Sequence, residues 1–222
     1  ALNTPVRQAS AQVFLRVLRD GLLGAPGGSN LLLPRTDLGA LLPEPAAAWV
    51  AARGGAVRLG ERVDALRRTP TGWRVGDENF EHVLLAAPAA ASATLVAEAA
   101  EGARPEIAGA LHTWAATAAA LPHQAITTIY AQASAPAPGQ TLLRTPMLAL
   151  RAGPGAPAQF VFERDAIAPG AQPTHLLAFV VSASSGERQA LQAATAAQAQ
   201  AQLGLQVVPL LTVSEKRATF AC

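Results

Sequence analysis

Residues 49–88 read WVAARGGAVRLGERVDALRRTPTGWRVGDENFEHVLLAAP, and this stretch decides the fold that the sequence predicts. Good helix formers precede Gly54, and glycine supplies the left-handed conformation that ends many helices. Apolar and polar residues alternate at 56–59 and again at 61–66, which predicts two short strands. Gly60 interrupts the alternation, so we expect a bend or bulge between them.

A hairpin and a buried strand complete the stretch. Residues 73–75 and 80–85 flank a polar, turn-rich loop at 76–79, which has the length of a hairpin connection. Residues 83–87 are apolar on both faces, as in a strand that is covered by layers on both sides, and Pro88 closes this strand. We therefore expect it to take a parallel or central position in a layered α/β sheet.

Outside this stretch, capping residues and β-branched runs predict further helices and strands. Asn3 or Thr4 is expected to cap a first helix, and Ser184-x-x-Glu187 forms a capping box before a helix with a stripe of alanines. A polar break is expected at 214–217. The other expected elements are helices at 89–101 and from Pro105, and an antiparallel group of strands at 125–132, 147–150, 159–162 and 175–181, with an apolar run at 207–213.

The order of elements in residues 49–88 resembles the middle segment of the flavin-dependent amine oxidase and phytoene desaturase superfamily. In that superfamily a late crossover returns the chain to the FAD-binding domain. Asn3-Thr4-Pro5, QASAQVF at 8–14 and LLLPRTDL at 31–38 are similar to its squalene-associated branch, the hydroxysqualene dehydroxylases. The resemblance implies that the chain is a central fragment of an FAD-dependent oxidoreductase that acts on a squalene-type isoprenoid, and that the fragment alone is inactive.

The resemblance also implies the fold class, α/β with an α+β part. It predicts a fragment of an FAD/NAD(P)-binding, glutathione-reductase-like domain and a mixed-sheet, helix-covered substrate domain. Residues 32–88 and 211–222 would be the remnant of the FAD-binding domain. Residues 1–31 and 89–210 would form the substrate-binding domain.

The same resemblance implies the cofactor contacts. In the family, the strand at Val63 contacts the adenine of FAD through its backbone, and the strand that ends at Ala87 and Pro88 passes near the cofactor. Val63 could equally be a core residue. The pyrophosphate-binding glycines of the family lie outside this segment. GPGAPA at 153–158 formally matches a dinucleotide fingerprint, but its prolines remove backbone donors and a strand follows it, so we expect no phosphate there.

Apolar and aromatic residues of the second region form the candidate substrate pocket. An isoprenoid has few polar groups and must be bound by apolar side chains, while the flavin is the reactive group. No catalytic residue can be named from the sequence. The candidates, which could instead be ordinary core residues, are Trp114, Tyr130, Phe160 and Phe179, with Met147 and Phe162 beside them.

Composition argues against nucleic-acid binding, a metal site and a membrane-spanning helix. The net charge is +2 and Lys216 is the only lysine, so no basic stripe indicates nucleic acid. The four histidines form no i, i+4 pair and have no cysteine beside them, so we expect no metal site. Cys222 is the only cysteine, which favours a reducing, cytoplasmic compartment. No run reaches the ~18 apolar residues of a spanning helix, and neither end resembles a natural terminus.

Three interpretations remain open at this point. The first is the squalene-associated enzyme, associated peripherally with the inner membrane, where its substrate resides. The second is a phytoene-desaturase-like or amine-oxidase-like flavoenzyme that acts on another substrate. The third is a lipid-binding module without chemistry.

Overall fold

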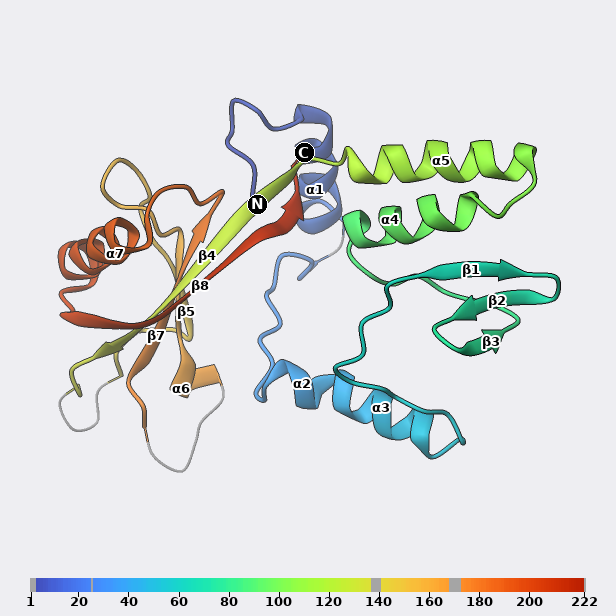
Figure 1. Cartoon of the computed structure of the whole chain (residues 1–222). Helices are drawn as coiled ribbons and strands as arrows, with labels where there is room; N and C mark the ends of the chain where they lie inside the picture. The colour runs from blue at the N-terminus through green and yellow to red at the C-terminus, as the bar shows by residue number, and fades with distance from the viewer. Residues whose placement is uncertain (1–2, 25, 137–140, 168–172, 222) are drawn as a thin grey trace. The chain divides into compact units, whose positions relative to one another are not determined.

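The computed structural model describes residues 3–24, 26–136, 141–167 and 173–221. The chain forms two compact units (Figure 1). One unit is Gly55–Pro122, and the other combines Ala1–Gly54 with His123–Cys222. The compact units therefore do not divide at Pro88, where the sequence pattern changes.

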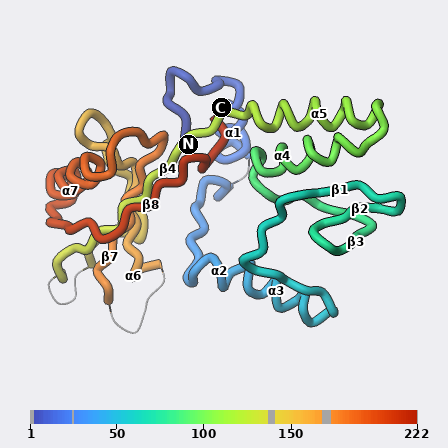
Figure 2. Tube along the Cα trace, viewed as in Figure 1, coloured from blue at the N-terminus to red at the C-terminus, as the bar shows by residue number. Residues whose placement is uncertain are grey.

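The unit Gly55–Pro122 consists of a three-stranded antiparallel sheet, in the order β1-β2-β3, and two helices. Figure 2 shows the two helices running side by side in opposite directions. The helix α4 packs on β1 through Leu66, Leu95 and Ala99. The elements are β1 (Leu66–Thr69), β2 (Gly72–Val75), β3 (Glu78–Phe80), α4 (Ala89–Ala100) and α5 (Pro105–Ala119).

Prolines stand at the starts of both helices, as predicted for Pro105, whereas Pro88 was expected only to close a strand. Pro88 is the N-cap residue of α4, and Pro105 opens α5. Proline suits these positions because its missing N–H would have no partner in the first turn of a helix. A cluster of small and medium side chains then joins the two helices: Ala93, Val96, Ala115 and Ala118.

A hairpin is confirmed, but its turn is tighter than predicted, and its second strand is Glu78–Phe80 instead of residues 80–85. Val75 pairs with Glu78, so the connection is Gly76-Asp77 alone. Gly76 has φ +58°, and two-residue hairpin turns require such positive values. A Cβ atom at Gly72 would collide with the carbonyl oxygen of Phe80, so a glycine is required there as well.

The strand predicted at 61–66 is wrong for residues 61–65, and only Leu66 of that range belongs to a strand, β1. The predicted strands at 56–59 and 83–87 are wrong for the part of the chain that the structure describes. Neither segment pairs with another strand, and every observed strand pair is antiparallel. Leu59 and Leu84 are 88% and 92% exposed. A buried parallel strand needs hydrogen-bonding neighbours, and none is present for these segments among the described residues. Antiparallel sheets with helices agree with the α+β part of the prediction, and the described residues show no FAD-domain fold.

The second unit contains a five-stranded antiparallel sheet in the order β5-β6-β7-β4-β8. The predicted antiparallel group is therefore confirmed, although the sheet is not mixed. Two helices contact this sheet, α6 at β6 and β7, and α7 at β8. The elements are β4 (His123–Ala133), β5 (Met147–Ala149), β6 (Phe160–Glu163), α6 (Arg164–Ile167), β7 (Leu176–Ser182), α7 (Arg188–Leu203) and β8 (Val207–Phe220).

Strand β8 is longer than predicted and pairs differently. The expected polar break at 214–217 lies inside it, because Ser214 and Glu215 still pair with β4. A register shift opposite residues 124–126 accommodates the charged residues that follow. The segment 211–222 was expected to belong with 32–88, yet through residue 220 it is the edge strand of the sheet that contains β4.

Helix α7 covers one face of this sheet and closes the main core. Ala199 and Leu191 of α7 contact a buried cluster that includes Ile129, Leu177 and Phe179. The expected alanine stripe does not make this contact, because Ala190, Ala197 and Ala201 are exposed. Instead, the Gln198 side chain accepts from the Ala158 N–H at 2.9 Å and donates to its carbonyl at 2.8 Å. Hydrogen-bonding geometry, which a hydrophobic pattern cannot reveal, therefore sets the packed face of α7.

The predicted capping box is also replaced by other contacts. The N-cap residue of α7 is Glu187, and its side chain makes no capping bond. Ser184 lies outside the helix, and its hydroxyl accepts from Thr127 at 2.9 Å. Thr127 is in turn 2.8 Å from the Ser214 hydroxyl. These three hydroxyls tie the β7–α7 connection to β4 and β8.

Thr195 offers a stability test inside this core. It is 1% exposed, and its hydroxyl has no partner among the described residues. We expect Thr195→Val to raise the free energy of unfolding by about 1 kcal/mol, because an unpaired buried hydroxyl is removed at constant shape. Thr212 is the matched control, because its hydroxyl accepts from Gln192 at 2.8 Å. Thr212→Val should therefore destabilise the protein, and urea denaturation monitored by circular dichroism measures both changes.

Asp165 organises the chain between α6 and β7. Its carboxylate accepts from the Thr174 hydroxyl at 2.6 Å, the Thr174 N–H at 2.8 Å and the His175 N–H at 2.7 Å. Burial by itself would raise the pKa of Asp165, but these hydrogen bonds and the charge of His175 together lower it below the ordinary carboxyl value.

This lowered pKa sets a pH dependence. The stabilisation is fully present above the pKa that Asp165 has in the unfolded chain, and it is lost as the pH falls through the lower folded pKa. We expect Asp165→Asn to destabilise the protein at neutral pH by about 1–3 kcal/mol. The difference in unfolding free energy between the unsubstituted protein and Asp165→Asn should become smaller below about pH 4. Urea denaturation over a series of pH values measures this difference. A difference that does not change with pH would contradict the lowered pKa of Asp165.

The N-terminal segment forms three helices, α1 (Ala11–Leu22), α2 (Leu38–Leu41) and α3 (Pro43–Ala51). Ser10, and neither Asn3 nor Thr4, caps α1. Asn3 instead joins β8 to the residue that follows β7, because its side chain donates to the Thr219 hydroxyl at 2.7 Å and accepts from the Ala183 N–H at 2.6 Å. Gly54 has φ +79° just after α3, as predicted. None of the helices in the described residues has the length and apolar character needed to cross a membrane.

Candidate functional site

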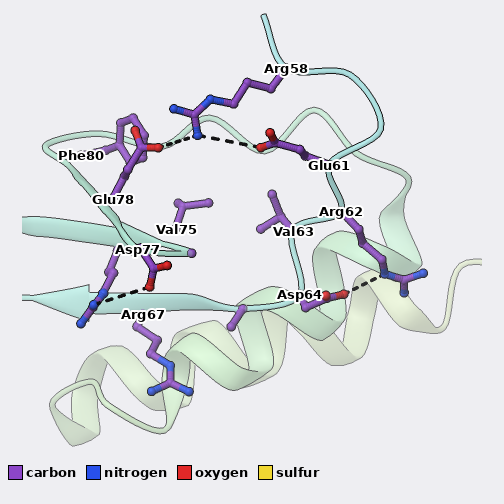
Figure 3. Close-up of a pocket in the computed structure, with 13 residues that line it drawn as sticks. Arg58, Glu61, Arg62, Val63, Asp64, Arg67, Val75, Asp77, Glu78 and Phe80 are labelled. Atoms are coloured by element: carbon purple, nitrogen blue, oxygen red, sulfur yellow. Dashed lines mark hydrogen bonds and ion pairs between the residues drawn. The ribbon is translucent and has the colours of Figure 1, made fainter. Parts of the chain in front are cut away.

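A pocket of about 710 Å³ lies in the unit Gly55–Pro122, between the segment that precedes β1 and the β2–β3 hairpin (Figure 3). Arg58 reaches across it to Glu78 at 2.5 Å and to Glu61 at 3.8 Å. Val63 and Val75 lie between the ion pairs and form the apolar part of the lining together with Phe80. The pocket therefore has an apolar wall with charged groups around it.

The Arg58–Glu78 pair holds the two sides of the pocket together. The hydrogen bond and the charge of Glu78 raise the pKa of Arg58, and the same contacts with Arg58 lower the pKa of Glu78. Both side chains are about half exposed, so solvent and salt weaken their attraction. The pair therefore serves chiefly to position the segment that carries Val63.

The structure separates the residues that were expected to contact the cofactor. Val63 lines the pocket, and it is 46% exposed rather than buried in a core. Ala87 and Pro88 do not line it. Their carbonyl groups accept from the Ser92 hydroxyl at 3.2 Å and from the Ser92 N–H at 3.0 Å, which fixes the start of α4.

A second candidate site is the face of the five-stranded sheet opposite α7. Residues that pair directly across strands lie on the same face, and successive residues alternate between faces. The row Leu148, Val161, Phe179, Ile129 and Thr212 therefore shares one face, and it is the face that α7 covers.

Two rows lie on the opposite face, and we call them together the apolar face. They run from β5 across the sheet to β8, and all their side chains but two are apolar. Leu211 and Val213 at the β8 edge are 55% and 49% exposed. The rows are Met147, Phe162, Ala178, Tyr130 and Leu211, and Ala149, Phe160, Val180, Thr128 and Val213.

The substrate candidates from the sequence fall in three places. Tyr130 and Phe160 lie on the apolar face, where Met147 and Phe162 accompany them. Phe179 is fully buried on the face that α7 covers. Trp114 is 48% exposed on α5, in the other compact unit.

Sequence reasoning missed several members of the apolar face. Leu211 and Val213 were assigned to the cofactor domain, and Val180 was not singled out within its apolar strand. Period-two alternation along 207–213 could have suggested that alternate residues share a face. Only the pairing of β8 with β4 identifies that face as the one that carries Tyr130.

Two further expectations concern phosphate and metal sites. The turn at 153–158 closes with a bridge between Gly153 and Ala156, and β6 follows it, as predicted. No helix starts there to offer free N–H groups to a phosphate. Within the described ranges, no group of three or more histidine, cysteine or acidic residues could hold a metal ion.

Comparison with known proteins gives one partial similarity. No protein-family model matches the chain. The chain is 41% identical over 80 residues to a protein named hydroxysqualene dehydroxylase from Rhodopseudomonas palustris. The matched segment covers 36% of this chain and 19% of the length of that relative. The chain therefore spans only a small part of the length of that relative.

Proposed function

We propose that the chain is the central part of an FAD-dependent oxidoreductase that converts hydroxysqualene to squalene. The observation that carries the proposal is the 41% identity over 80 residues to hydroxysqualene dehydroxylase. The sequence resemblance to the squalene-associated branch points the same way. We call the full enzyme, of which this chain would be the centre, the complete protein.

The apolar face supports an isoprenoid substrate. A hydrocarbon chain gains roughly 25 cal/mol for each Å² that it removes from water, so it needs few polar anchors. The apolar face offers such a surface on a rigid sheet, and Phe160 and Phe162 provide its largest apolar side chains. Such a substrate resides in membranes, so the proposal includes peripheral association of the complete protein with a membrane surface.

The pocket that Val63 lines supports the proposal, because it could hold the adenine end of FAD. Its volume of about 710 Å³ falls in the range of small-molecule sites, and Val63, Val75 and Phe80 give it an apolar wall for a flat ring. The flavin, when bound and reduced by an external donor, would supply the two electrons needed to replace the hydroxyl by hydrogen with release of water. The pyrophosphate needs donors at a glycine-rich helix start, and the described residues provide none. We therefore expect this chain alone to bind FAD weakly or not at all.

A lipid-binding module is the second candidate. The observation that favours it is the composition of the apolar face, which carries hydroxyl groups at Tyr130 and Thr128 but no acidic or basic side chain in its two rows. Such a module would bind isoprenoids without flavin and without turnover.

The experiment that tests the proposal uses the purified complete protein. Incubation with hydroxysqualene and dithionite as the electron source should produce squalene, identified by mass spectrometry, and the protein should show flavin absorbance. The same protein after removal of the flavin is the control. Binding of hydroxysqualene without flavin absorbance and without squalene formation would favour the lipid-binding module instead.

A further inference from the structure

The apolar face carries two polar groups within its rows, and they lie next to the edge strand β8. These are the phenol of Tyr130 and the hydroxyl of Thr128, both on β4. Strand β4 has β7 on one side and β8 on the other, so apolar residues flank both hydroxyls. Residues two apart on a strand point to the same side and are separated by roughly 7 Å along it.

Neither hydroxyl has a hydrogen-bond partner among the described residues, although the opposite face shows the reverse arrangement. There, Thr127 bonds to Ser184 and lies 2.8 Å from the Ser214 hydroxyl. Thr212 accepts from Gln192. The sheet hydroxyls of Thr127 and Thr212 on the α7 side thus have partners within the protein, whereas Tyr130 and Thr128 remain available to water or to a ligand.

We propose that Tyr130 and Thr128 bind the single hydroxyl of an otherwise apolar isoprenoid ligand. This inference rests on the proposed function and specifies which part of the substrate binds where. A hydrocarbon that covers the apolar face removes water from both hydroxyls and leaves them unpaired, which costs free energy. A ligand with a hydroxyl at that point restores a hydrogen bond. The site therefore prefers the hydroxylated isoprenoid to the plain hydrocarbon.

The preference for a hydroxylated ligand weakens binding of the product relative to the substrate. The substrate carries the hydroxyl that the reaction removes, and the product lacks it. The product therefore leaves Tyr130 and Thr128 without a partner as long as it covers them. The site holds the substrate more tightly than the product, which favours product release.

The test compares hydroxysqualene and squalene as ligands of the complete protein. We expect hydroxysqualene to bind about fivefold to tenfold more tightly than squalene, and Tyr130→Phe with Thr128→Val to abolish that difference. These substitutions keep the shape of both side chains, so squalene should bind with unchanged or higher affinity. Phe162→Leu is the matched control, because it should weaken both ligands equally.

The outcomes separate this inference from the proposed function. Equal affinity of the unsubstituted protein for both ligands would overturn the inference and leave the proposed function standing. A preference for hydroxysqualene that survives both substitutions would also overturn it. Failure to bind either isoprenoid would overturn the proposed function and the inference together.

Discussion

Phe179→Ala is expected to lower the free energy of unfolding by about 3–5 kcal/mol. Phe179 is fully buried and packs with Ile129, Val161 and Leu177 under α7. Truncation to alanine leaves a cavity that such a tightly packed sheet fills only in part. Urea denaturation monitored by circular dichroism measures the loss.

Phe160→Ala is the matched control for this prediction. Phe160 is the same residue type in the neighbouring strand, but it lies half-buried on the apolar face. Its truncation should cost about half as much or less, because the side chain leaves water only in part. Equal losses for the two phenylalanines would contradict the assignment of the two faces.

In the complete protein, Phe160→Asp should lower turnover of hydroxysqualene about a hundredfold or more, with the flavin spectrum unchanged. The substitution places a carboxylate on the apolar face, and a hydrocarbon cannot cover that charge without stripping its water. Each loss of about 1.4 kcal/mol in transition-state stabilisation corresponds to a tenfold loss in rate. Steady-state kinetics and flavin absorbance measure the two quantities on the same sample.

Ala197→Asp provides the control for the added charge. Ala197 is exposed on α7, away from the apolar face, so this variant should keep its turnover. Unchanged turnover in Phe160→Asp with an intact fold would show that the apolar face does not hold the substrate. Loss of turnover in both variants would show that added charge alone disturbs the enzyme.

Local chemistry predicts the longer helices and several strands, whereas the short helices α2 and α6 were not expected. The alanine-rich stretch at 89–101 predicts α4, Pro105 predicts the start of α5, and the β-branched run at 125–132 predicts β4. The turn at Gly76 also follows from local rules. These elements are predictable because residues close in the sequence determine them.

Long-range pairing explains what the sequence could not predict. Residues 83–87 have the pattern of a buried strand, but no described strand pairs with them. Residues 211–222 of β8 were expected to belong to the FAD-binding domain, yet the partner of β8 is β4, more than 70 residues earlier in the chain. Phe160 and Phe179 look alike in the sequence, and only the register of β6 and β7 places them on opposite faces.

The candidate sites also combine residues that local sequence can identify with contacts that only long-range pairing creates. Val63 could be singled out through the family resemblance, but the pocket beside it depends on Arg58 meeting Glu78, which are 20 positions apart. The apolar face depends on four strand pairings at once. Tyr130 and Thr128 gain their significance only when those pairings show that they are the polar groups of the two rows.

The most direct test of the account is to locate the isoprenoid on the complete protein. A squalene analogue with a photoreactive group would be bound, activated by light and traced to its attachment sites by peptide mass spectrometry. The account predicts attachment to peptides that carry Tyr130, Phe160, Phe162 or Leu211, and competition by unlabelled hydroxysqualene. Competed attachment confined to α7 or to the α4–α5 pair would contradict it.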